Sequence, residues 1–315
     1  MGFRALYMGT AEIACASLKA LHELPDCEVV GVITQPDRPK GREMKAHFSP
    51  VKKYAIELEL PVLQPQTLRN NETLGHLRSF HPDLFVVAAF GQILPQAILD
   101  LPKHGAVNIH ASILPRHRGA APIQWAILEG DEETGATLMK MDAGLDTGEI
   151  IAVSRTRIFE TDNSRILRDR LADIGASLIT NSLPYYISGK IMPKQQNESL
   201  ATYARKIVKN DGKIDWSLPS TDIYRRIRAF TPWPGAFTYL PIRQRNLLKI
   251  HEATTSELSG SAGEIISITE NTLVVACGNG SLDLTEIQRE GSRVMDVKNF
   301  LNGCTLKPGM ILGEA

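Results

Sequence analysis

Two polar side chains, two residues apart, close a short apolar segment near the middle of the chain. The segment Ala106–His110 reads AVNIH and contains Asn108 and His110. Residues two apart on a strand face the same side of a sheet, so a strand here would project the amide and the imidazole together. Both groups donate hydrogen bonds. Because ligands bind beyond the carboxyl ends of strands in open parallel sheets, we expect this pair in a catalytic site.

A carboxylate on a glycine-flanked loop is the third candidate. Residues 139–150 read MKMDAGLDTGEI, in which Gly144 and Gly148 flank Asp146. Such a loop brings a carboxylate into a site without steric obstruction. Asp142 lies in the same segment and is the competing carboxylate. We favour Asp146 and keep Asp142 as the alternative.

An irregular segment follows the Asn-x-His pair. Residues 111–121 read ASILPRHRGAA, which contains a proline, a glycine and two arginines and so is not a regular strand. We predict an ordered loop that feeds a long helix beginning at Pro122, because proline suits the first turn of a helix. His117 is expected on the surface of this loop.

The first half of the chain alternates apolar strands with helical segments, which predicts the scaffold for these residues. Helices are predicted at 12–24, 50–59 and 164–188, and strands at 4–8, 29–33, 61–63, 84–89, 106–110 and 150–153. Strand–helix–strand repetition implies an α/β, Rossmann-like, mostly parallel sheet covered by helices. Residues 190–199 are polar and without periodicity, which is typical of a linker.

The second half of the chain has a different pattern of predicted secondary structure. A helix is predicted at 220–229, and short strands follow at 236–240, 247–251, 263–268, 272–276 and 281–287. Strands this short, separated by Gly and Asn turns, suggest a small OB-like β-barrel, a fold that often binds nucleic acid. We therefore expect a catalytic domain at 1–189, a linker at 190–207 and a barrel domain at 208–315.

The charge of the chain is balanced overall but uneven along it. The 315 residues include 35 Lys and Arg and 35 Asp and Glu, which disfavours a protein that coats nucleic acid through a global positive field. Residues 38–53 nevertheless carry six basic and one acidic residue, and 201–249 carry ten and three. Residues 121–150 carry one and seven. The two basic segments suit phosphate contacts, and an ordinary solvated face is the alternative.

Other features narrow the class of protein. No apolar run reaches the ~20 residues that a membrane span needs, and the first residues do not resemble a signal peptide. None of the four cysteines sits in a CxxC pair, so we expect packing roles in a reducing, cytoplasmic compartment and no zinc site. Gly9 and Thr10 lack the rest of a GxGxxG fingerprint, which argues against a dinucleotide cofactor.

The central motif resembles that of the folate-dependent formyltransferases. Residues 108–122 fit N-x-H-x-S-x-L-P-x-x-R-G-x-x-P, and 144–148 read GLDTG. The resemblance extends over nearly the whole chain. IDW at 214–216 and PWP at 232–234 are similar to the members that act on tRNA.

The resemblance implies transfer of a formyl group from 10-formyltetrahydrofolate to the α-amino group of initiator methionyl-tRNA, for translation initiation. Direct attack of the amine would give a tetrahedral intermediate, whose oxyanion Asn108 and His110 would stabilise. Asp146 would orient His110, favour its charged form and relay a proton through water. This chemistry requires neither a covalent enzyme intermediate nor a metal.

The family motifs also imply binding residues and partners. A pterin slot would be lined by Phe90, Gly91, Ile93 and Leu94 on one side and by Ser112, Ile113, Leu114 and Pro115 on the other. The alternative for Phe90 and Leu94 is a plain core role. Arg42 and Lys206 are the candidate tRNA contacts, and we expect a monomer that does not bind membranes. The competing functions are a formyltransferase acting on a small amine and a non-catalytic RNA-binding protein with the same fold.

Overall fold

The computed structural model describes residues 2–40, 45–241 and 246–313. It divides into two compact units. The first comprises Met1–Pro122, Glu133–Arg157 and Arg168–Ala204, and the second Ile123–Glu132, Ile158–Leu167 and Arg205–Ala315. The predicted linker region up to residue 204 therefore clusters with the first unit, and two short earlier segments cluster with the second. None of the helices in the described residues is long and apolar enough to cross a membrane.

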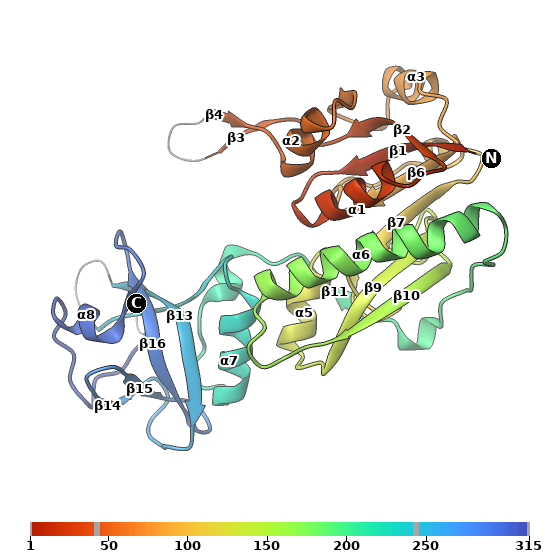
Figure 1. Cartoon of the computed structure of the whole chain (residues 1–315). Coiled ribbons are helices and arrows are strands. Elements are labelled where there is room, and N and C mark those ends of the chain that lie inside the picture. The colour runs from red at the N-terminus through yellow and green to blue at the C-terminus, as the bar shows by residue number, and fades with distance from the viewer. Residues whose placement is uncertain (1, 41–44, 242–245, 314–315) are drawn as a thin grey trace. The chain divides into compact units, whose positions relative to one another are not determined.

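The first unit is built on a seven-stranded sheet of order β10-β9-β7-β6-β1-β2-β5 (Figure 1). Its strands are β1 (Phe3–Gly9), β2 (Cys27–Ile33), β5 (Val62–Leu63), β6 (Leu84–Ala88), β7 (Ala106–His110), β9 (Glu133–Lys140) and β10 (Ile150–Arg157). The five strands from β5 to β7 pair in parallel, and β9 and β10 are antiparallel additions beyond β7. The predicted α/β class with a mostly parallel sheet is confirmed.

Helices cover both faces of this sheet because the central strands are apolar on both sides. Ala5 and Tyr7 of β1 face a cluster with α1 (Ile13–His22), α2 (Pro50–Glu57) and α6 (Ser164–Ile187). Leu6 and Met8 face the opposite cluster, to which α3 (Asn71–Ser79) and α4 (Gln96–Leu99) contribute. Burying one such side chain contributes about 1.5–3 kcal/mol, so the doubly covered strands form a rigid base for the loops at their ends.

The loops after β1, β2 and β6 converge at the carboxyl edge of the sheet. Thr10 Oγ1 and Gln35 Nε2 both donate to the carbonyl oxygen of Phe90, at 3.0 and 2.9 Å. Gly91 has φ +78°, and a Cβ there would lie 2.6 Å from Gln35 Nε2, so this position needs glycine. The carboxyl end of β7 lies at the same edge, because β6 and β7 are parallel neighbours.

Several elements of the first unit were not predicted. The strand β9 reads ETGATLMK and the helix α3 reads NETLGHLRS, and neither carries a strong apolar period. The helix α5 (Pro122–Leu128), which lies in the second unit apart from Pro122, begins at the predicted proline but is short rather than long. A hairpin of β3 (Arg38–Lys40) and β4 (Lys45–His47) lies in the first basic segment.

The second unit is an antiparallel sheet of order β12-β13-β16-β15-β14, with β17 on β16. Its elements are η2 (Lys209–Gly212), α7 (Ser220–Ala229), β12 (Ala236–Tyr239), β13 (Leu247–Ser256), β14 (Ile265–Ile268), β15 (Leu273–Ala276), β16 (Ser281–Arg289), β17 (Met295–Asp296) and α8 (Val297–Leu301). Ile223 and Ile227 of α7 pack into the same core as Phe300 of α8. The five strands predicted for this part of the chain are all present.

Candidate functional site

His110 lies at the carboxyl end of β7 and is buried, with 6% of its surface exposed. Its Nε2 lies 2.9 Å from the carbonyl oxygen of His117. Because a carbonyl oxygen only accepts, this contact places a proton on Nε2. Nδ1 lies 3.6 Å from Oδ2 of Asp146, which is beyond a normal hydrogen bond. A proton on Nδ1 would give an imidazolium that faces this carboxylate.

Asn108 occupies the position two residues earlier on the same strand. It pairs with Val87 of β6 and Met139 of β9, so β7 is held on both sides and the alternation of its side chains is regular. Asn108 is half-buried and projects from the same face as His110. The structure therefore places an amide and an imidazole together at the edge where the loops converge.

Asp146 follows on a loop in the left-handed backbone region, with φ +55°. Its Oδ2 accepts a hydrogen bond from the backbone N–H of Gly119 at 2.8 Å. Asp142 is exposed, and its Oδ1 accepts instead from the N–H of Gly144, at 2.9 Å. Asp142 thus shapes the loop, while Asp146 faces His110, which favours Asp146 as the functional carboxylate.

Gly148 ends the Asp146 loop at a point where its backbone passes close to the backbone of Lys140. A Cβ on Gly148 would overlap the carbonyl oxygen of Lys140, which is backbone and does not move aside. We expect Gly148→Ala to lower the free energy of unfolding by about 1–3 kcal/mol, measured by urea denaturation. Gly75→Ala is the matched control, because an added Cβ in the middle of α3 meets nothing within 4 Å. It should raise stability by about 0.5–1 kcal/mol, and equal stability of the two variants would refute the steric argument.

The candidate folate residues fall into a buried and an exposed set. Phe90 and Leu94 are 2% and 3% exposed and belong to the core cluster on one face of the sheet, as their alternative role predicts. Gly91 and Ile93 are exposed. The segment of Ser112, Ile113, Leu114 and Pro115 is fixed from β9, since Thr137 Oγ1 donates to the Ser112 carbonyl oxygen at 2.7 Å.

His117 is not a surface residue, and this expectation was wrong. Only 2% of its surface is exposed. The strand β8 (Arg118–Gly119) pairs in parallel with β11 (Tyr203–Ala204), and the His117 N–H donates to Thr202 Oγ1 at 2.8 Å. Residues that lie far along the chain cover this loop, and no local pattern reveals such a contact.

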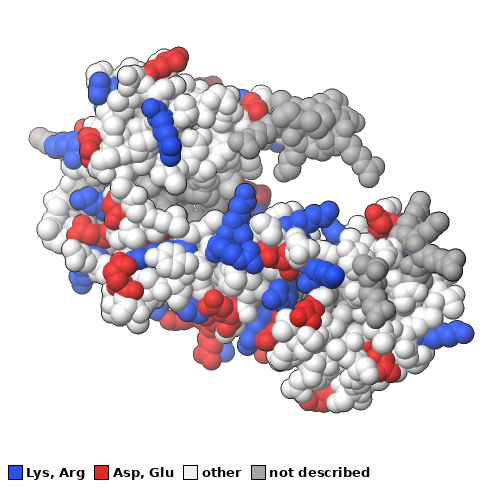
Figure 2. Space-filling view, turned by 180° about the vertical axis from the view of Figure 1, so that it is seen from behind, with Lys and Arg blue, Asp and Glu red and all other residues white. Residues whose placement is uncertain are grey.

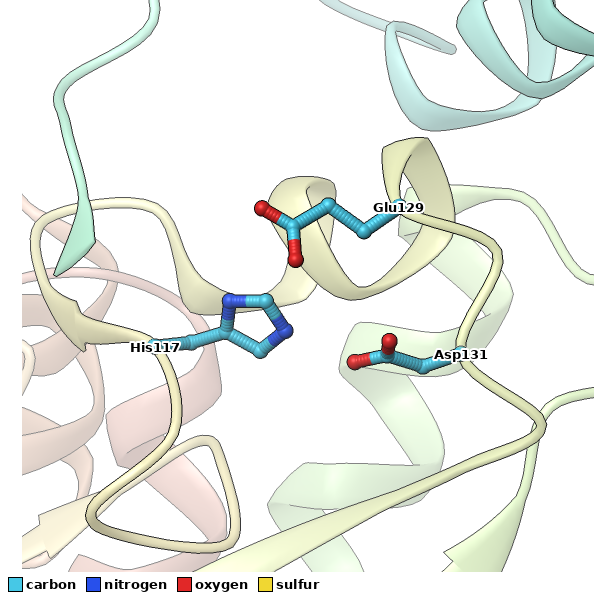
Figure 3. Close-up of side chains that lie close together, drawn as sticks. All are labelled: His117, Glu129 and Asp131. Atoms are coloured by element: carbon cyan, nitrogen blue, oxygen red, sulfur yellow. The ribbon is translucent and has the colours of Figure 1, made fainter. Parts of the chain in front are cut away.

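His117 also appears with two carboxylates in Figure 3, which labels it together with Glu129 and Asp131. Imidazole and carboxylate groups are metal-ligand types. His117 belongs to the first unit, whereas Glu129 and Asp131 belong to the second. The three side chains therefore do not form a set within either unit, and we assign no metal site to them.

Some basic side chains of the second unit are engaged in contacts within it. Arg205 forms an ion pair with Asp211 at 2.8 Å, and Arg228 donates to the carbonyl oxygen of Glu160 at 2.8 Å. Lys206 is exposed. Figure 2 shows Lys and Arg side chains lying among Asp and Glu side chains on the visible face. The other candidate contact, Arg42, lies outside the described residues.

Three further residues near the Asp146 loop, Arg118, Gln196 and Glu198, are not predicted from the sequence. Arg118 is fully buried, and Gln196 contacts the backbone of the Asp146 loop. No motif in the sequence links these positions, which are about 80 residues apart.

Two family models match the chain. The formyl transferase model matches residues 4–183, and the model of the formyl transferase C-terminal domain matches residues 206–305. The chain belongs to the formyl transferase family. Its two matched regions account for most of both units, and the predicted family resemblance is confirmed.

Relatives in this family resemble the chain over its whole length. A methionyl-tRNA formyltransferase of Geobacter sulfurreducens is 45% identical over 100% of this chain and 98% of its own. One from Myxococcus xanthus is 47% identical over 97% of this chain and 96% of its own.

Two solved structures share the fold at low identity. An N-formyltransferase from Helicobacter canadensis, solved with folinic acid and dTDP-3-aminofucose, superposes with a TM-score of 0.63 at 20% identity, over 92% of this chain and 100% of its own. HypX from Aquifex aeolicus, solved with tetrahydrofolic acid, superposes with a TM-score of 0.63 at 16% identity, over 96% of this chain and 47% of its own. Identities this low support the fold alone.

Proposed function

We propose that this chain transfers the formyl group of 10-formyltetrahydrofolate to the α-amino group of initiator methionyl-tRNA, giving N-formylmethionyl-tRNA for translation initiation. The observation that carries the proposal is the 45–47% identity, over both matched domains, to relatives named methionyl-tRNA formyltransferase. The pairing of a buried imidazole with a carboxylate at the carboxyl edge of the sheet gives that activity a chemical basis.

The reaction begins with attack of the neutral amine on the formyl carbon. An α-amine has a pKa of about 8, so a useful fraction is neutral near pH 7 without strong activation. A new C–N bond forms and the carbonyl oxygen becomes an oxyanion. The Asn108 amide donates to that oxyanion, and His110 stabilises it electrostatically when the ring carries a proton on Nδ1 as well. Because Nε2 is held by the His117 carbonyl oxygen, the Nδ1 side of the ring is the side that meets the reacting groups.

The intermediate then collapses when the bond between the formyl carbon and the folate nitrogen breaks. The amine has one proton to lose and the leaving nitrogen has one to gain. Asp146, next to His110 and fixed by the Gly119 N–H, relays this proton through a water molecule. The protein ends the cycle in its starting protonation state, and no step requires a covalent intermediate.

We assign the folate to the carboxyl edge of the sheet. Gly91 and Ile93 offer an exposed backbone and an exposed side chain there, and the segment from Ser112 to Pro115 lies in the loop that follows β7. Phe90 and Leu94 support this slot from the core rather than from its surface. A flat pterin ring suits a narrow apolar slot with backbone polar groups at its rim.

We assign the tRNA to the two basic segments, with Arg42 in the first and Lys206 in the second as contacts to phosphates. Arg205 and Arg228 of the second unit are engaged inside it, whereas the exposed Lys206 offers a side chain for contact with a polyanion. We place the reaction in the cytoplasm, where charged tRNA is found, and expect a monomer.

The binding of tRNA should depend on salt far more than the binding of folate. Each phosphate contact releases counterions, so raising the salt concentration from ~50 to ~200 mM should weaken tRNA binding at least about tenfold. Folate binding should change little. Parallel titrations of the two ligands at both salt concentrations measure this. An equal loss for both ligands would contradict two separate sites.

A competition assay tests the choice of acceptor. The protein is incubated with 10-formyltetrahydrofolate and either methionyl-tRNA or a small amine such as an amino-sugar nucleotide, and formylated products are quantified. We expect kcat/KM for methionyl-tRNA to exceed that for the small amine by at least about a hundredfold. A preference for the small amine would replace the proposed substrate with the competing one.

A further inference from the structure

A buried arginine stands next to the site. Arg118 is 0% exposed, and a buried charge is tolerated only when it is paired and hydrogen-bonded. Its Nη1 and Nη2 donate to the two carboxylate oxygens of Glu198, at 2.8 and 2.7 Å. Its Nε and Nη2 donate to Oε1 of Gln196, at 3.1 and 2.8 Å. The hydrogen bonds to Glu198 raise the pKa of Arg118, so the guanidinium stays charged.

The amide nitrogen of the Gln196 side chain contacts the loop that carries Asp146. Its Nε2 donates to the carbonyl oxygen of Asp146 at 2.8 Å and to that of Gly148 at 2.7 Å. The contacts of Oε1 and of Nε2 together fix the orientation of the Gln196 amide. Reversing it would place Oε1 against two carbonyl oxygens and Nε2 against a guanidinium.

The Asp146 loop needs such a support because of its backbone. A residue other than glycine at φ +55° costs about 1–2 kcal/mol relative to the usual regions. That conformation directs the Asp146 carboxylate to the Gly119 N–H and to His110. Release of the Asp146 and Gly148 carbonyls would let the backbone relax and move the carboxylate away from the imidazole.

We propose that Gln196, backed by the buried Arg118, is a positioning residue for the reaction: it holds Asp146 in the conformation that aims its carboxylate at His110. The hold is made within the first unit, by a segment that enters the second unit a few residues later along the chain. This inference rests on the proposed function for its kinetic consequence, but the hold itself has a readout that does not depend on activity.

Gln196→Glu tests the kinetic consequence. The change keeps the size of the side chain and its contact with Arg118, but replaces the donor that faces two carbonyl oxygens with an acceptor. A misplaced catalytic group lowers the rate of the chemical step, so kcat should fall about tenfold or more, with KM for both substrates within about threefold of wild type. Gln195→Glu makes the same change at the exposed neighbour and should leave kcat within about twofold. A Gln196→Glu kcat within twofold of wild type, or a loss confined to KM, overturns the proposal.

Hydrogen exchange of the Gly119 amide tests directly whether Gln196 fixes the position of Asp146. This N–H donates to Asp146 Oδ2, so it should exchange at least about tenfold faster in Gln196→Glu than in wild type and Gln195→Glu. Unchanged exchange overturns the proposal. If wild type formylates no methionyl-tRNA, the proposed function fails, while the exchange rates still decide the role of Gln196. Should Gln196→Glu not fold, Gln196→Ala removes the same donor without adding charge, and the same outcomes apply.

Discussion

Replacement of His110 by alanine should lower kcat about 100-fold or more without unfolding the protein. The variant loses the imidazole that we propose as the oxyanion stabiliser, whose Nδ1 lies 3.6 Å from Oδ2 of Asp146. Asp146→Asn should cost a similar factor, because the amide keeps the shape of the side chain but neither carries charge nor relays a proton. Single-turnover formylation of methionyl-tRNA measures both variants.

The two losses should not add. His110 and Asp146 act as a pair, so removing either one removes most of what the other contributes. We expect the double variant to be slower than either single variant by less than about tenfold. His76→Ala, on the exposed part of α3, is the control for loss of an imidazole and should keep wild-type kcat. Activity of His110→Ala or Asp146→Asn within a few-fold of wild type would refute the roles given to them.

Asn108→Ala should lower kcat about 100- to 1000-fold, the usual cost of deleting one oxyanion donor. The amide acts on charge that develops only in the transition state, so the KM values should change little. Asn108→Asp tests the same point with a side chain of equal size, since it places an acceptor where the donor stood. Steady-state kinetics with both substrates varied measure the effect. A change confined to KM would instead make Asn108 a ground-state binding residue.

Local patterns predicted the elements that position the site but missed those whose stability comes from tertiary packing. β7 and α7 have the predicted limits because a short apolar run and a helical apolar period define them. β9 is buried along most of its length, yet its Thr and Gly residues interrupt the continuous apolar run that marks a buried strand. α3 is polar, and its clearest signal is the Asn70 side chain, which accepts from the Thr73 N–H at 2.9 Å.

Local patterns likewise predicted some residues of the candidate site and missed others. The alternation of a strand sufficed to place Asn108 and His110 on one face, and the flanking glycines pointed to Asp146. The choice between Asp146 and Asp142 gained support only from the structure, where Asp142 is engaged in its own loop. The support from Gln196 and the burial of His117 depend on segments 50 and 85 residues apart, and no local spacing encodes such contacts.

The most direct test of the account follows the formyl group itself. Wild type and His110→Ala are incubated in parallel with 10-formyltetrahydrofolate and methionyl-tRNA, and the amino acid released from the tRNA is identified by mass. We expect N-formylmethionine from the wild-type reaction and a rate at least about 100-fold lower from the variant. Unmodified methionine from the wild-type reaction, or equal rates from the two proteins, would contradict the central claim.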